Sequence, residues 1–121
     1  MIAWQKNDLA FQASKEYSWS SFPIQVAFQC GAVSLTLDGY WNGDRTWTVR
    51  FAPTQPGTWT WRSHSSDPAM DQQQGEIECV APTTDQVKDN PNLRGFIGVS
   101  DSGRHFTYAD GTPFFWLGDT V

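Results

Sequence analysis

The chain has 121 residues, a formal net charge of −5 at pH 7 and a pI of about 4.7. Its eight lysine and arginine residues are scattered, which argues against nucleic-acid binding and membrane-surface binding, because both usually need a basic patch. No apolar run approaches the length of a transmembrane helix. The length suits one domain of ordinary size, and aromatic residues, at 15% of the chain, provide bulky side chains for its core.

Apolar and polar residues alternate with a period of two through most of the sequence, as they do in half-buried β-strands. This alternation predicts strands within residues 2–14, 22–30, 33–37, 46–51, 58–62 and 76–81. Turn signals separate them at residues 18–21, Gly31, Asn42-Gly43, 53–57 and 63–74. The pattern contains no helix of normal length and no internal repeat, so it predicts an all-β fold, an immunoglobulin-like antiparallel β-sandwich.

The most apolar pair of strands lies on either side of residues 53–57, which hold Pro53, Pro56 and Gly57. The pattern predicts a β-hairpin with this loop, whose apolar face needs a second layer to cover it. Thr48 and Thr60 fall on the outward phase. The side chains predicted to lie inside are Ile24, Val26, Phe28, Val33, Leu35, Leu37, Trp47, Val49, Phe51, Trp59, Trp61 and Ile77.

The last third of the sequence is more polar before the strand pattern resumes. Residues 83–94 are predicted to form a linker with at most one helical turn. A short strand follows at residues 96–99, and residues 105–109 are predicted to pair with residues 113–117 across Asp110-Gly111. We expect the chain after about Asp85 to be held less firmly than the sandwich. The apolar side chains of this tail that need a cover are Phe106, Phe114, Phe115 and Trp116.

Two stretches resemble known families. Tyr40-Trp41-Asn42-Gly43, followed by Trp47-Thr-Val-Arg-Phe-Ala-Pro and Pro56-Gly-Thr-Trp-Thr-Trp, resembles the β-sandwich domain of unknown function that precedes some bacterial glycoside hydrolases. Residues 104–120 resemble the opening of an apiosidase-like (β/α)8 catalytic domain. The resemblance implies a sandwich domain at residues 1–82, a linker at 83–94, and at 95–121 the hairpin and first strand of a barrel. Since a (β/α)8 barrel needs roughly 200 residues, we expect this chain to be the N-terminal piece of a longer hydrolase.

The resemblance implies a non-catalytic ancillary domain of a glycoside hydrolase that acts on polysaccharide or oligosaccharide. Its partners would be carbohydrate and the catalytic barrel of the same polypeptide. Two alternatives remain open: an autonomous carbohydrate-binding module that uses exposed aromatic side chains, and an immunoglobulin-like interaction domain. The sugar, the linkage and the oligomeric state stay undetermined.

No residue of the sequence is predicted to be catalytic. Glycoside hydrolysis normally needs two carboxyl groups across a sugar site, and the close pair Glu76 and Glu78 is better interpreted as the solvated face of a strand. The resemblance places Asp119 at the end of the first barrel strand, where substrate sites of barrels form. Trp19 and Trp41 lie in or beside turns, and they are the other predicted substrate-binding residues.

Metal and cofactor sites are not predicted. His64 and His105 have no second ligand at metal spacing. Asp67 and Asp71 share a loop but lack a calcium-binding pattern. The sequence also contains no phosphate-binding glycine motif.

Cys30 and Cys79 both fall on the inward phase of their strands. They are either joined by a disulfide across the core, as in immunoglobulin domains, or buried as free thiols.

Residues following Met1 show no signal peptide. The expected location of such an enzyme is secreted or periplasmic, and a cytoplasmic location stays open.

Overall fold

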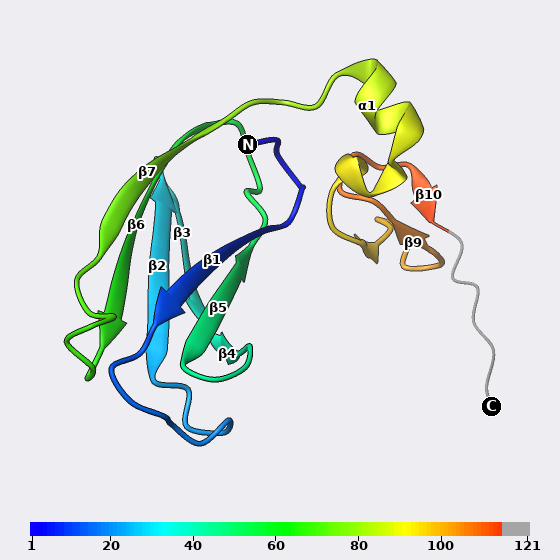
Figure 1. The fold of residues 1–121 in the computed structure, drawn as a ribbon. Helices are drawn as coiled ribbons and strands as arrows, with labels where there is room; N and C mark the ends of the chain where they lie inside the picture. The colour runs from blue at the N-terminus through cyan, green and yellow to red at the C-terminus, as the bar shows by residue number, and fades with distance from the viewer. Residues whose placement is uncertain (115–121) are drawn as a thin grey trace, which may run out of the picture.

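A computed structural model describes residues 1–114 and confirms the all-β class (Figure 1). Two antiparallel sheets pack face to face. The first has the order β1-β5-β4, with β1 at Asn7–Gln12, β4 at Tyr40–Trp41 and β5 at Thr46–Phe51. The second has the order β3-β2-β6-β7, with β2 at Ile24–Cys30, β3 at Val33–Asp38, β6 at Gly57–Ser65 and β7 at Gln74–Cys79.

Aromatic side chains join the two sheets across the core. Phe28 stacks on Phe51 with ring centroids 3.9 Å apart, and Phe51 meets Trp59 edge to face at 5.2 Å. Such pairs add to the stabilisation that comes from burial alone. Seven of the twelve side chains predicted to lie inside are fully buried: Ile24, Val26, Phe28, Trp47, Val49, Phe51 and Trp59.

The other five predicted core residues are half-buried against this cluster: Val33, Leu35, Leu37, Trp61 and Ile77. Val33, Leu35 and Leu37 lie on β3 and Ile77 lies on β7, the two edge strands of the four-stranded sheet. The opposing sheet has only three strands, so it does not cover those edges fully. Trp61 also lies towards the edge, where its ring meets Phe11 of β1 at 5.8 Å.

The predicted hairpin around residues 53–57 is wrong. β5 and β6 belong to different sheets, so the loop between them carries the chain from one layer to the other. The two apolar faces cover each other across the core instead of lying side by side. The loop suits this crossing because Pro53 and Pro56 prevent a tight two-residue turn.

Thr48 is more buried than the alternation of the sequence predicts. Its side chain points away from the core as predicted, yet only 2% of the residue is exposed. β5 is the central strand of its sheet, so Thr48 is flanked by Ala10 and Tyr40 on the neighbouring strands. Asn42 Nδ2 also donates a hydrogen bond to Thr48 Oγ1 at 3.2 Å. A central position therefore buries a residue that alternation alone places in water.

The tail after β7 begins with more helix than predicted. Helix α1 spans Thr84–Asp89 and the 3₁₀ helix η1 spans Pro91–Arg94, where the sequence predicted a linker with at most one turn. Thr83 and Gln86 cap α1 reciprocally through a capping box, which supplies partners for its first N–H groups.

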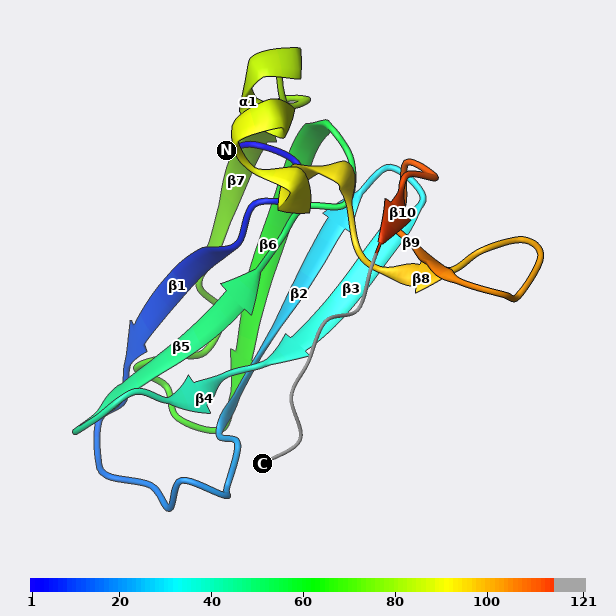
Figure 2. The ribbon, with the colours of Figure 1, turned by 90° about the vertical axis from the view of Figure 1, so that its right-hand side faces the viewer.

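A small sheet of order β10-β9-β8 follows η1, with β8 at Gly98–Val99, β9 at Phe106–Thr107 and β10 at Pro113–Phe114. Figure 2 shows it beside the sandwich. The predicted pairing across Asp110-Gly111 is confirmed, because Phe106 pairs with Phe114 and Thr107 with Pro113. The tail packs back on the sandwich where Trp4 meets Phe96 edge to face at 5.0 Å.

Cys30 and Cys79 are buried free thiols, so the disulfide alternative is not the one adopted. Both lie in the four-stranded sheet, on β2 and β7, and β6 runs between them. Strands two positions apart are separated by about 9–10 Å, beyond the Cα spacing that a disulfide allows. Burial raises the pKa of the Cys79 thiol, which keeps it protonated.

Candidate functional site

The loop of residues 13–23 and strand β4, which carry two of the predicted substrate-binding residues, lie at the same end of the sandwich, opposite α1 (Figures 1 and 2). Trp19 lies in the loop of residues 13–23 and is 73% exposed, whereas Trp41 of β4 is 48% exposed. Trp41 Nε1 donates to Asp44 O at 2.9 Å, which fixes the orientation of its indole. Asp119, the third predicted residue, lies outside the described residues.

The loop that carries Trp19 is tied to the sandwich by a buried carboxylate. Asp67 Oδ2 accepts hydrogen bonds from Ser14 N at 2.8 Å, from Ser14 Oγ at 2.9 Å and from Tyr17 OH at 3.0 Å. Asp67 Oδ1 accepts one from Ala69 N at 2.9 Å. These bonds, led by the one from the Ser14 backbone, lower the pKa of Asp67 to about 2. Asp67 is therefore a structural anion that holds the loop of residues 13–23 to the loop between β6 and β7.

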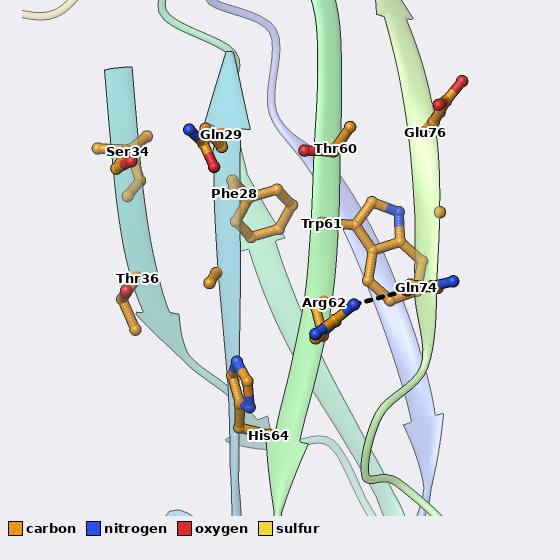
Figure 3. Close-up of a pocket in the computed structure, with 13 residues that line it drawn as sticks. Phe28, Gln29, Ser34, Thr36, Thr60, Trp61, Arg62, His64, Gln74 and Glu76 are labelled. Atoms are coloured by element: carbon orange, nitrogen blue, oxygen red, sulfur yellow. Dashed lines mark hydrogen bonds between the residues drawn. The ribbon is translucent and has the colours of Figure 1, made fainter. Parts of the chain in front are cut away.

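A hollow lies on the face of the four-stranded sheet that is turned away from the core (Figure 3). It has a volume of about 760 Å³. Its outward-pointing lining, which we call the sheet trough, consists of Ala27, Gln29, Ser34, Thr36, Thr60, Arg62, His64, Gln74 and Glu76. The half-buried Trp61 lies between β6 and β7 at the side of the hollow, against Gly75.

Strand register arranges the sheet trough in rows across the sheet. One row runs Thr36, Ala27, Arg62 and Gln74, and the next runs Ser34, Gln29, Thr60 and Glu76. Ala27, the smallest side chain in this lining, forms the floor between taller polar neighbours. Rows of outward residues follow each other at about 6.6–6.8 Å along the strands. The arrangement can offer several hydrogen-bonding groups to one extended ligand.

The glutamate pair and the two histidines considered in the sequence analysis are exposed. Glu76 and Glu78 are exposed on the outer face of β7, and Glu78 accepts a hydrogen bond from Thr58 Oγ1 at 2.7 Å. His64 lies in the sheet trough and His105 on the exposed turn before β9. Among residues 1–114, no group of three His, Cys, Asp or Glu side chains could hold a metal ion.

The tail presents an exposed apolar patch formed by Phe96, Ile97, Val99 and Phe106. Their exposed fractions are 56%, 44%, 66% and 43%. The four side chains lie within residues 96–106, and Val99 pairs with Phe106 across β8 and β9. In the part of the chain that the structure describes, no helix has the length and apolar character needed to span a bilayer.

The fold and these surfaces define a small β-sandwich domain with a polar sheet trough, an aromatic end and an exposed apolar patch on its tail. The chain belongs to the DUF5060 family, a domain of unknown function whose sequence pattern matches residues 1–66. No curated protein matches the sequence.

The crystal structure of a protein from Bacteroides vulgatus named "putative glycoside hydrolase" is similar, with a TM-score of 0.73 and 28% identity. The match covers 94% of this chain, so it includes most of the tail, and 21% of the other. This chain thus spans about a fifth of the length of that protein.

The sheet trough was missed by the sequence interpretation, which considered aromatic and acidic residues first. A signal was present, because the outward phases of four predicted strands carry amides, hydroxyls and Arg62 but no lysine. What alternation could not supply was the order of the strands. Only that order places β3, β2, β6 and β7 beside each other and gathers these side chains into one hollow.

Proposed function

We propose that this chain is a non-catalytic ancillary domain of a glycoside hydrolase that acts on polysaccharide or oligosaccharide. The observation that carries the proposal is the match of 94% of this chain to 21% of a much longer protein with a glycoside hydrolase name. The catalytic work would belong to a (β/α)8 barrel of the same polypeptide. Export to the periplasm or the medium would suit a polysaccharide substrate.

The carboxylates of residues 1–114 support a non-catalytic role. Asp67 is buried and accepts four hydrogen bonds from Ser14, Tyr17 and Ala69, which hold it ionised. Asp8 and Asp110 are engaged in ion pairs with Arg50 and Arg94. Glu76 and Glu78 stand on a strand face that is open to solvent.

The apolar patch of the tail supplies the contact surface that the proposal needs. Phe96, Ile97, Val99 and Phe106 would seat the catalytic barrel, since burial of exposed apolar side chains is the main favourable term in most associations. The same tail contacts Trp4 of the sandwich, so a barrel bound there would be positioned relative to the sandwich.

Two measurements test the proposal. The reading frame is expected to continue beyond Val121 for roughly 200 residues or more that encode a barrel; a stop codon directly after Val121 would contradict it. The 121-residue chain is expected to give no hydrolysis of aryl-glycosides or polysaccharides. Turnover that disappears in Glu76→Gln or Glu78→Gln would show that the chain is itself catalytic.

A second candidate, an autonomous carbohydrate-binding module, is favoured by the exposure of Trp19 and Trp41 at one end of the sandwich. Exposed indoles present an apolar face on which a sugar ring can stack. Trp19→Ala and Trp41→Ala variants separate this candidate from the first, because loss of polysaccharide binding in both would place the sugar at the aromatic end.

A further inference from the structure

The polar side chains of the sheet trough form few hydrogen bonds with the protein. Arg62 Nη2 donates to Gln74 Oε1 at 3.1 Å (Figure 3). Gln29, Thr60 and Glu76 form no side-chain hydrogen bond with the described residues, and Arg62 forms no ion pair with them. A guanidinium has five N–H donors, so most of the donors of Arg62 remain available to a ligand.

The outer face of the other sheet is different. Arg50 there forms an ion pair with Asp8 at 3.0 Å and donates to Tyr40 OH at 3.2 Å. Gln12 Nε2 donates to Thr46 Oγ1 at 2.9 Å. Polar side chains on β1, β4 and β5 therefore bond one another across the strands. The outer face of the four-stranded sheet has such pairs on either side of the trough, Gln25 with Asp38 at 2.9 Å and Thr58 with Glu78 at 2.7 Å. Between these pairs, the side chains of Gln29, Thr60 and Glu76 in the trough are open to solvent.

The chemistry of the sheet trough suits a ligand rich in hydroxyl groups. Arg62 supplies hydrogen-bond donors and Glu76 supplies acceptors. The amide of Gln29 and the hydroxyl of Thr60 can each donate and accept. Arg62 and Glu76 balance each other in charge, so the trough does not select a phosphate or an acidic peptide. Its volume of about 760 Å³ lies within the roughly 300–1,000 Å³ of small-molecule sites.

The hollow continues beyond the trough. His64 also lines a second hollow, which it shares with Phe22, Gln25 and Asp71 near the start of β2. Phe22 is 52% exposed and supplies an aromatic side chain to the lining of this second hollow. A ligand that extended from Glu76 past His64 to Phe22 would be longer than one sugar ring. The two hollows together therefore fit a chain of several sugars.

We propose that the sheet trough binds an oligosaccharide chain, hydrogen-bonded around Arg62 and extending past His64 towards Phe22. This inference deepens the proposed function, on which it rests, by assigning substrate contact to a surface of the ancillary domain. It is separate from the aromatic end formed by Trp19 and Trp41.

The test is native gel electrophoresis of the 121-residue chain through soluble polysaccharides, one set neutral (mixed-linkage glucan, xylan, galactomannan) and one acidic (polygalacturonate). Calorimetry with fragments of the polysaccharide that retards the chain most then gives the Kd. Arg62→Leu removes the hydrogen-bond donors of the guanidinium. Ala27→Phe places a large side chain on the floor of the sheet trough. The matched control is Arg50→Leu, which removes an arginine from the outer face of the opposite sheet. Melting temperatures establish that each variant is folded.

We expect Arg62→Leu and Ala27→Phe each to weaken binding about tenfold or more, since each removes hydrogen bonds to a charged group or blocks the floor, while Arg50→Leu binds as the wild type does. Phe22→Ala should weaken binding of long fragments more than of disaccharides. Retardation by none of the polysaccharides would overturn the proposal. So would binding that survives Arg62→Leu and Ala27→Phe but is lost in Trp41→Ala.

Failure of the trough proposal and failure of the proposed function would give different experimental results. If no polysaccharide binds but a barrel follows in the reading frame, the ancillary role stands and the trough proposal falls. If a polysaccharide binds through Arg62 and no barrel follows, the trough proposal stands and the chain is a binding module by itself.

Discussion

Asp67 is the residue that most strongly couples the loops at the aromatic end. Ser14 and Tyr17 come from the loop of residues 13–23, whereas Asp67 and Ala69 lie between β6 and β7, so the carboxylate joins segments far apart in the sequence. Burial and the hydrogen bond to Asp67 raise the pKa of the Tyr17 phenol. The position of Trp19 depends on this network.

The depressed pKa of Asp67 predicts an acid-dependent loss of stability. The folded-state pKa of about 2 lies below the ordinary value of 3.8, so the ionised carboxylate stabilises the fold above about pH 4 and loses that effect as pH falls towards 2. Asp67→Asn should lower the melting temperature by several degrees at pH 6 and flatten its decline between pH 4 and 2. Thermal unfolding measured over this range checks both effects.

The control for that experiment is Asp101→Asn, which removes an exposed carboxylate. It should leave both the melting temperature at pH 6 and the acid profile close to those of the wild type. An Asp67→Asn profile parallel to the wild-type profile below pH 4 would mean that another carboxylate governs the acid response.

Gly39 lies where the chain passes from β3 in one sheet to β4 in the other. Its N–H donates to Ile24 O at 2.9 Å, and a Cβ placed on it would come within 2.5 Å of the buried Ile24 Cγ2. The close approach of the backbone to Ile24 therefore requires glycine at this position.

Gly39→Ala is expected to destabilise the protein by about 1–3 kcal/mol, the usual cost of forcing an extra carbon into a packed core. Urea unfolding measures the free energy of unfolding of the variant. Gly98→Ala is the matched control, because a Cβ at Gly98 meets no atom within 4 Å. Equal stabilities of the two variants would show that the core relaxes around the added methyl group without cost.

At the level of elements, the crossing between β5 and β6 organises the sandwich. Residues 53–57 deliver Trp59 to the sheet opposite Phe51, where the two rings meet at 5.2 Å. Trp59 Nε1 donates to Gln55 O at 3.0 Å, so the loop itself satisfies the polar atom of the tryptophan that it introduces. A hairpin would have left both apolar faces on one side without a cover.

On the scale of the whole molecule, Trp4 joins the tail to the sandwich. Its N–H donates to Pro53 O at 2.7 Å, and its ring packs against Phe96 and Gly95 of the tail. Trp4 adopts a φ of 70°, a left-handed conformation that is rare for a bulky side chain. Such strain persists only where the surroundings over-determine the conformation, here through contacts with both parts of the molecule.

Trp4→Ala should release the tail while leaving the sandwich folded. Hydrogen exchange and limited proteolysis should then show faster exchange and cleavage within residues 83–114, with β2, β5 and β6 protected as before. Trp19→Ala is the matched control, since its side chain is 73% exposed and has little packing to lose. Unchanged protection of the tail in Trp4→Ala would show that other contacts hold it.

The sequence by itself determined which segments are strands and which of their side chains point inwards. It also located the turn at Asn42-Gly43 and the hairpin across Asp110-Gly111. These features follow from the two-residue period of an extended chain and from local turn chemistry.

The tertiary structure decided which sheet each strand joins. It separated β5 from β6, placed Cys30 and Cys79 too far apart to bond, brought Asp67 to Ser14, and gathered Arg62, Gln29 and Glu76 into one trough. These arrangements depend on contacts between segments far apart in the chain, because each apolar face is covered by whichever distant face fits it. Alternation shows that a strand has such a face, and the packing of the complete sandwich selects its partner.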